Sequence, residues 1–117
     1  MPALMSQSNG DVLVVYFTDS KILDEVKIQQ IADELSRLVE RAAGGKLLLN
    51  FHDVRFMSSA VLGKLVQLNK RCKENRVNLK LCSIAQDIME VFKITNLHRV
   101  FDIQPDEQRA LAAFVKI

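Results

Sequence analysis

The chain has 117 residues, of which 49% are hydrophobic and 26% charged, as is usual for one compact globular domain. The 16 basic and 14 acidic side chains are scattered along the sequence and leave a formal net charge of +2, which argues against nucleic acid as a partner. No apolar run is long enough to span a membrane and the N-terminus lacks a signal-peptide pattern. We therefore expect a cytoplasmic protein without membrane insertion.

The N-terminal third of the chain predicts a strand followed by a helix. Residues 1–9 are mostly small and polar, so we expect them to be disordered or to form an edge strand ahead of a domain at residues 10–117. The run DVLVVYF, from Asp11 to Phe17, is rich in valine, as in a strand buried on both faces. After a loop, an apolar stripe at helical spacing ends at a glycine pair; its members are Ile28, Ile31, Leu35, Leu38 and Ala42.

The central third repeats this order. KLLLNF, from Lys46 to Phe51, predicts a second buried strand, and HDVRFM predicts a short loop. A helix is expected to begin near Ser58. Its inward side chains are expected to be Leu62, Leu65, Val66, Asn69 and Cys72.

The last third contains two more strand and helix pairs. VNLKLCSI predicts a strand, and AQDIMEVFKIT predicts a short helix with Ile88, Val91 and Phe92 on one face. RVFDI predicts a short final strand and PDEQRALAAFV a closing helix, which begins with proline and acidic residues. Alternation of this kind predicts an α/β fold whose strands are mainly parallel.

The sequence contains no familiar enzyme signature. It lacks GxxxxGK[ST], GxGxxG and GxSxG motifs, and no Cys/His spacing indicates a metal site, so we expect no cofactor, no metal and no catalytic residue. Cys72 and Cys82 are expected to be small core residues rather than a disulfide. His52, beside Asp53, could orient as a base toward a serine in a small hydrolase, although a loop histidine is more often solvated.

Four segments together resemble the STAS domain, the fold of bacterial anti-sigma factor antagonists. In order along the chain they are GDVLVVYF leading to ILDE, KLLLNFHDVRFMSSAVLGKLVQL, LKLCSIAQDIMEVFKITNLHRVFDI and DEQRALAAF. The resemblance runs from about Gly10 to Phe114. It implies a central, mixed but mostly parallel sheet of four to five strands with about four helices.

The segment FMSSAVLG matches the signature of this family, which is a hydrophobic pair followed by Asp-Ser-Ser-Gly-Leu-Gly. In this register, Ser59 falls where the family has its phosphorylated serine, and Ser58 stands where the family has aspartate. Ala60 and Val61 replace the second serine and the first glycine, and we expect the branched side chain of Val61 to hinder close approach of a partner. Upstream, the pair Leu23-Asp24 matches a Leu-Asp pair whose acid lies near the phosphorylation site in relatives.

The resemblance implies a regulatory protein that is not an enzyme. In such a system, a histidine-kinase-like anti-sigma factor phosphorylates the serine with ATP, a PP2C-type phosphatase removes the phosphate, and the unphosphorylated form binds the anti-sigma factor. The expected acceptor is Ser59, with Ser58 as the alternative. The expected partner-binding residues are Asp24, Arg55, Ser58 and Ser59.

Two other interpretations of the serines stay open. Serine is a common N-cap residue, so either hydroxyl could serve only to cap a helix. The absence of the expected aspartate and glycine also allows a constitutive STAS interaction or scaffold module, including a transport-associated one, which would bind its partner without phosphorylation.

Overall fold

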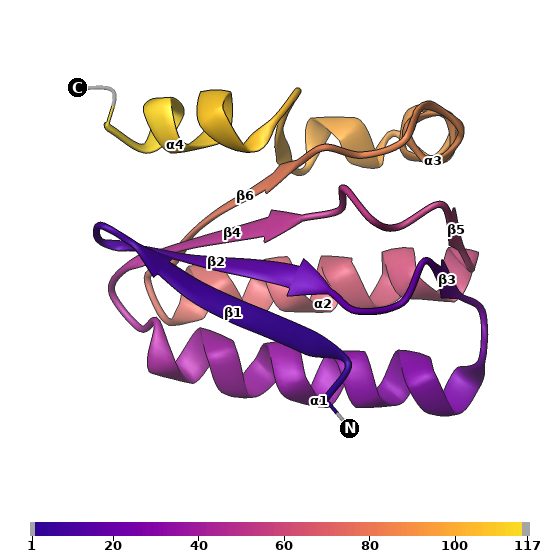
Figure 1. Ribbon diagram of the computed structural model, residues 1–117, viewed down its shortest axis with the longest axis horizontal. Helices are drawn as coiled ribbons and strands as arrows, with labels where there is room; N and C mark the ends of the chain where they lie inside the picture. Colours follow the sequence, from indigo (N-terminus) through magenta and orange to yellow (C-terminus); the bar gives the residue numbers. More distant parts are fainter. Residues whose placement is uncertain (1, 116–117) are drawn as a thin grey trace.

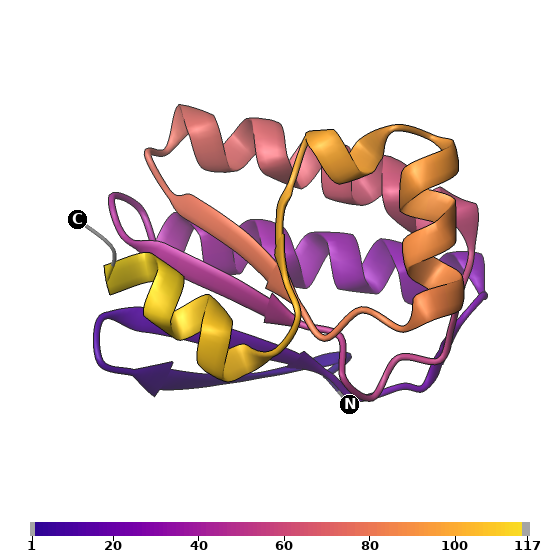
Figure 2. The same cartoon turned by 90° about the horizontal axis from the view of Figure 1, so that it is seen from above.

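The computed structural model describes residues 2–115, which form a three-layer α/β fold around a five-stranded sheet of order β1-β2-β4-β6-β7. Helices α1 and α2 cover one face of the sheet and α4 the other, while α3 lies at the end toward which β2 and β4 run (Figures 1 and 2). The fold therefore confirms the expected α/β class, with a mixed, mostly parallel sheet and four α-helices.

The strands of the main sheet are short and the two longest helices pack on the same face. The strands are β1 (Leu4–Asn9), β2 (Val12–Phe17), β4 (Lys46–Asn50), β6 (Asn78–Cys82) and β7 (Asp102–Gln104). The helices are α1 (Glu25–Arg41), α2 (Ser59–Glu74), α3 (Gln86–Ile94) and α4 (Glu107–Val115), with a short 3-10 helix η1 (Leu97–Arg99). Two further strands, β3 (Lys21–Ile22) and β5 (Phe56–Met57), pair with each other outside the main sheet.

The first two strands form a hairpin, and every other pairing in the main sheet is parallel. Asn9 pairs with Val12, so the loop has two residues, and Gly10 at its first position has a φ of +62°. Glycine adopts this left-handed conformation without the steric cost that a side chain would add. The polar N-terminal segment thus forms an edge strand at residues 4–9.

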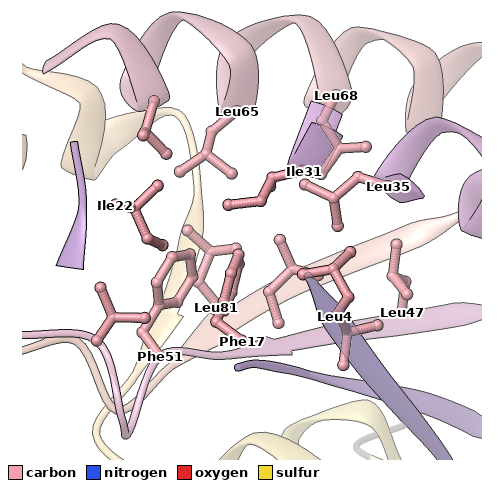
Figure 3. Close-up of a cluster of buried hydrophobic side chains, with 14 of the residues drawn as sticks. Leu4, Phe17, Ile22, Ile31, Leu35, Leu47, Phe51, Leu65, Leu68 and Leu81 are labelled. Carbon is pink, nitrogen blue, oxygen red and sulfur yellow. The ribbon is translucent and has the colours of Figure 1, made fainter. Parts of the chain in front are cut away.

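The main core lies between the sheet and the α1/α2 layer, where aliphatic side chains from the strands meet those of both helices (Figure 3). At the end of the strands, the rings of Phe17 and Phe51 stack with centroids 4.7 Å apart. A smaller cluster on the opposite face joins the sheet to α4; its buried members are Val12, Val14, Leu48, Cys82, Ala110 and Phe114.

Two of the predicted helix faces need correction. In α2, Val66 is exposed and Asn69 is only half-buried, while Leu68 and Val61 are buried in their place. In α3, Ile88 and Phe92 are buried as expected, but the side chain of Val91 is exposed. The α2 prediction misplaced two residues and the α3 prediction one, because spacing alone does not show where an apolar face ends.

The two cysteines are buried on opposite faces of the sheet, Cys72 in the main core and Cys82 beneath α4. Burial raises the pKa of each thiol to about 11, so both are protonated at neutral pH. This burial confirms that they act as small core residues. Within residues 2–115, no helix has the length and apolar character needed to cross a bilayer, and no group of three or more His, Cys, Asp or Glu side chains is arranged to hold a metal.

Candidate functional site

The small β3/β5 sheet brings together two loops that lie far apart in the sequence. Lys21 pairs with Phe56 and Ile22 with Met57 in parallel register. At the end of this sheet, the backbone N–H of Ser58 donates to the carbonyl of Ile22 at 2.9 Å. The start of α1 and the start of α2 are thereby fixed beside each other, at one end of the molecule (Figure 1).

Ser58 is the N-cap residue of α2. Its backbone is extended, with φ −67° and ψ 147°, and its hydroxyl oxygen accepts a hydrogen bond from the N–H of Ala60 at 3.2 Å. The first N–H groups of a helix have no partner inside the helix, and the serine hydroxyl satisfies one of them. The hydroxyl of Ser58 therefore has a structural role in this conformation.

Ser59 is the first residue of α2 and its side chain is exposed. Within residues 2–115, its hydroxyl has no hydrogen-bond partner. It lies at the positive end of the α2 dipole, which favours a negative group. The two adjacent serines thus differ: one hydroxyl is engaged in capping and the other is free.

Of the other two predicted partner-binding residues, Arg55 lies with the serines, and its exposed side chain has no ion pair within the described chain. Its N–H donates to the carbonyl of Ser20 at 2.8 Å, which holds it at the start of β5. Asp24 is the N-cap residue of α1 but its side chain caps nothing, so its carboxylate is exposed at the neighbouring helix start.

Beside the serines lies a cavity of about 190 Å³, which we call the switch pocket. Arg55, Ser58 and Ser59 line it together, and Asp24 does not. The remaining wall is mostly apolar and comes from β5, α2 and α3; it consists of Phe56, Met57, Leu62, Ile88 and Val91, with Asp87 at the rim. The pocket therefore combines hydroxyl groups with an apolar lining.

Large apolar side chains are exposed around this end of the molecule. Phe56 and Val91 line the switch pocket and are 54% and 38% exposed. Leu23 and Val26 at the start of α1, and Ile94 at the end of α3, are also exposed. Exposed apolar groups gathered in one region are typical of a protein–protein interaction surface. The α3 wall of the pocket could not be predicted from the sequence, because Val91 was expected to face the core.

His52 does not join the serines. Its ring lies 3.3 Å from the carboxylate of Asp53, and both side chains are exposed. They line a separate, polar hollow with Tyr16, Asn50 and Glu107 on the α4 side of the sheet, and no hydrogen bond links His52 to Ser58 or Ser59 within residues 2–115. The base and nucleophile geometry that a serine hydrolase needs is not formed here.

Comparison with known proteins agrees with this architecture. The STAS domain family matches residues 3–110, so the chain belongs to that family. The structure is similar to an anti-sigma-factor antagonist (STAS) domain protein from Planctomyces limnophilus, with 27% identity over 97% of this chain and 98% of that one and a TM-score of 0.86. STAS domains that resemble anti-sigma factor antagonists are generally non-catalytic.

Two more distant structures share the fold. A putative anti-sigma factor antagonist from Thermotoga maritima is 19% identical over 97% of this chain and 95% of that one, with a TM-score of 0.83. The phosphorylated form of SpoIIAA, a Bacillus cell fate determinant, is 16% identical over 97% of this chain and its whole length (100%), with a TM-score of 0.70. At these identities the likeness concerns the fold alone.

Proposed function

We propose that this protein is a phosphorylation-regulated interaction switch of the anti-sigma factor antagonist type, with Ser59 as the acceptor. The observation that carries the proposal is the free, exposed hydroxyl of Ser59 at the start of α2, beside the apolar switch pocket. In the unphosphorylated state, the pocket and the side chains of Phe56 and Val91 bind the partner. Arg55 and Asp24 contribute polar contacts at the rim.

Phosphate at this position has a direct physical effect on such an interface. The positive end of the α2 dipole favours the phosphate and Ser59 is exposed, so the fold is retained. The phosphate nevertheless adds nearly two negative charges beside an apolar surface, and these charges must be desolvated when a partner binds. Partner binding is therefore lost while the domain stays folded.

The replacement of the family aspartate by Ser58 is compatible with this mechanism. Aspartate and serine are both good N-cap residues, and Ser58 performs the capping. Because its hydroxyl is already engaged with the N–H of Ala60, Ser58 is the less accessible acceptor of the pair. Val61 is only 2% exposed and faces the core, so its branched side chain does not obstruct a partner, contrary to our expectation.

The partners of this function are those that the resemblance to anti-sigma factor antagonists implies. A histidine-kinase-like anti-sigma factor that uses ATP phosphorylates Ser59 and a PP2C-type phosphatase removes the phosphate, both acting in the cytoplasm. The structures of SpoIIAA in its phosphorylated and unphosphorylated forms show that the same fold can carry such a modification in a distant relative.

The test is to incubate the protein with such a kinase and ATP and to map the modified residue by mass spectrometry. We expect phosphate on Ser59, no phosphate in Ser59→Ala, and an unchanged acceptor in Ser58→Ala. In a pull-down with the same kinase, Ser59→Asp should lose binding and Ser59→Asn, its uncharged counterpart, should keep most of it. Absence of modification at both serines would contradict the proposal.

A constitutive interaction module is the second candidate. It is favoured by one observation: no acidic residue directly precedes Ser59, so this recognition element of the family signature is missing. Such a module would use the same switch pocket without regulation. Equal partner binding by the wild type and Ser59→Asp would identify it.

A further inference from the structure

Beyond its first residue, the edge strand β1 is open on the side away from β2. It is the first strand in the sheet order, and no strand within residues 2–115 pairs with its outer edge. Figure 1 shows β1 at the front of the sheet, above α1. Its sequence, LMSQSN, contains no charge and no proline, which are the usual protection of an exposed edge.

The hydrogen-bonding pattern identifies the groups that this edge presents. Thr18 donates to the carbonyl of Ala3 at 3.1 Å, and Asn9 pairs with Val12 across the turn. Because the ladder alternates, the odd-numbered residues of β1 face β2, and the N–H and C=O groups of Ser6 and Ser8 point outward.

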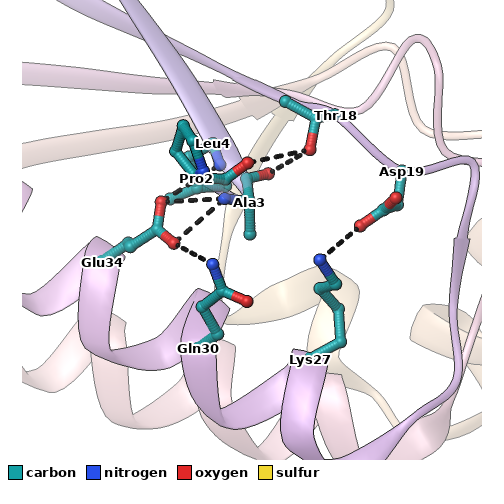
Figure 4. A network of polar contacts seen from close by, with 8 residues as sticks. All are labelled: Pro2, Ala3, Leu4, Thr18, Asp19, Lys27, Gln30 and Glu34. Atoms are coloured by element: carbon teal, nitrogen blue, oxygen red, sulfur yellow. Dashed lines mark hydrogen bonds and ion pairs between the residues drawn. The ribbon is translucent and has the colours of Figure 1, made fainter.

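One carboxylate already occupies the start of this edge. Glu34 of α1 accepts hydrogen bonds from the N–H groups of Ala3 and Leu4 at 3.0–3.2 Å, and Gln30 donates to it at 2.9 Å (Figure 4). The N–H of Leu4 therefore has a partner, whereas the next outward positions remain available to an added strand.

A hollow of about 270 Å³ lies between β1 and α1, and we call it the edge groove. A second hollow of about 340 Å³, which shares Arg41 with it, lies beside the β1–β2 turn and the segment that follows α1. Leu4 and Leu38 lie in the floor of the edge groove. Leu4, Ser6 and Ser8 are every second residue of β1, so their side chains all lie on the α1 side of the strand. Because the two serine side chains are small, they do not fill the space beside α1.

The charge of the edge groove is positive. Arg37 and Arg41 line it, both are exposed, and neither has an ion-pair partner within the described chain. The nearby carboxylates are engaged: Glu34 with the β1 backbone, Glu40 with Arg71 at 2.9 Å, and Asp11 with Lys46 at 2.6 Å. The guanidinium groups of Arg37 and Arg41 are therefore available to pair with acidic side chains of a partner.

The spacing of these charges matches a strand. Residues four apart on a helix rise by about 6 Å along its axis, and alternate residues of a strand are about 6.6 Å apart. Acidic residues at alternate positions of an added strand therefore reach Arg37 and Arg41 while its backbone pairs with Ser6 and Ser8.

We propose that the edge of β1 binds an extended segment of a partner protein that carries acidic residues at alternate positions. Strand addition supplies the backbone hydrogen bonds, and the two arginines select the acidic side chains. A second copy of this chain fits less well, because its β1 has no acidic residue and would bring two more arginines into the groove. This surface is separate from the switch pocket.

The test uses a fluorescent peptide, Thr-Glu-Thr-Glu-Thr-Glu-Thr, and measures its anisotropy with the full chain. We expect saturable binding that weakens as salt is added. The corresponding lysine peptide should not bind. A glutamate peptide with an N-methyl group on every amide, which has no backbone N–H to donate to a strand, should bind at least about tenfold more weakly because several backbone hydrogen bonds are lost.

Variants of the chain locate the binding. Arg37→Gln/Arg41→Gln should weaken the glutamate peptide roughly three- to tenfold, whereas Lys70→Gln/Arg99→Gln, with the same net charge, should not. Ser6→Pro removes an outward N–H and restricts the backbone at this position, and it should abolish binding, with Ser6→Ala as its control. Ser59→Asp should bind the peptide like wild type, which separates this surface from the proposed switch.

If Ser6→Pro fails to fold, NMR of the wild type gives an independent result. Peptide binding should shift the backbone amide signals of Ser6 and Ser8. The proposal is overturned if the glutamate peptide does not bind, if the N-methylated or lysine peptide binds equally well, or if the arginine and control variants bind alike. Self-association through β1 without peptide binding would instead identify a second copy as the occupant.

Discussion

At the scale of single residues, Ser58 and Ser59 have the same chemistry but different environments. The hydroxyl of Ser58 accepts from the N–H of Ala60, and that of Ser59 has no partner within residues 2–115. The difference arises because the chain turns from the extended N-cap conformation into the helix between them. One serine therefore belongs to the fold and the other is available for regulation.

This difference predicts unequal effects on stability. Ser58→Ala should lower the free energy of unfolding by about 1 kcal/mol, because one helix N–H loses its partner. Ser59→Ala should change it by no more than about 0.5 kcal/mol, as is usual for an exposed site. Ser58→Asp, which restores the residue type expected from the family, should retain the cap. Urea unfolding of the three variants measures these values, and equal losses for both alanine variants would contradict the assignment.

The helix start near Ser58 could be predicted from the sequence, because apolar residues recur at helical spacing after it. The engagement of one hydroxyl could not be predicted, since either serine is a suitable cap. Residue type shows that either serine can cap a helix. Because α2 begins at Ser59, Ser58 is the residue that caps it.

At the scale of elements, the attachment of β7 and α4 to the sheet depends on a buried lysine. Lys80 of β6 is 7% exposed; its ammonium group contacts the carboxylate of Asp102 in β7 and lies 5.0 Å from the centre of the Phe114 ring in α4. Burial alone would raise the pKa of Asp102, but hydrogen bonds from Lys80 and Gln104 hold it below its usual value. One charge thus connects three elements.

Removing the carboxylate should leave this charge unpaired. Asp102→Asn should lower the free energy of unfolding at pH 7 by about 1–2 kcal/mol, less than for a fully buried pair because Asp102 remains partly in water. Lys80→Met/Asp102→Asn, which removes both charges, should recover much of this loss. If the double variant is less stable than Asp102→Asn, the unpaired charge is not the cause.

The pH dependence has a defined sign. Because the pKa of Asp102 is lower in the folded state, the ion pair stabilises the protein fully above the unfolded pKa, about 4. The contribution is lost as the pH falls through the lower, folded value. The difference between wild type and Asp102→Asn should therefore stay constant from about pH 7 to pH 5 and shrink below about pH 4.

The elements themselves were predictable to different degrees. The four helices and the buried strands have apolar runs long enough to identify them, whereas the polar β1 could equally have been a disordered segment. The strands β3 and β5 have two residues each, too few for any period to be seen, and they exist because the two loops meet in space. Without them, the proximity of the two helix starts could only be inferred by resemblance.

At the scale of the whole molecule, the sheet separates two cores of unequal size. The α1/α2 side contains the main cluster, while the α4 side has a cluster of six buried residues, two of which belong to the nine-residue helix itself. Stability is not uniform in such a structure, and thinly attached elements open locally before the domain unfolds. We expect α4 to be the first element to detach.

The reactivity of the two cysteine thiols measures how readily each layer opens, and no mutation is needed. In native buffer, Cys82 should react with an isotope-coded maleimide about tenfold or more faster than Cys72, because only local opening of α4 is needed to expose it. Peptide mapping by mass spectrometry gives both rates in one sample. In denaturant the rates should converge. Equal and slow rates in native buffer would show that both thiols are exposed only by global unfolding.

The order of strands and helices was sufficient to predict the class of fold, because a strand followed by a helix returns parallel to the previous strand. The arrangement of the surface cavities was harder to predict from the sequence. The switch pocket draws its walls from β5, α2 and α3, and the edge groove from β1 and α1. Such cavities depend on side chains that meet across elements, which no local pattern of the sequence records.

The hairpin at Gly10 also has a consequence for how the chain folds. The β1–β2 pairing closes a loop of two residues, whereas each parallel pairing must wait for an intervening helix to be placed. Hairpins form in about 1–10 μs, and pairings between distant segments are slower because they order more chain before any contact is gained. The nascent hairpin is thus ready to serve as the template on which β4, and then β6, assemble.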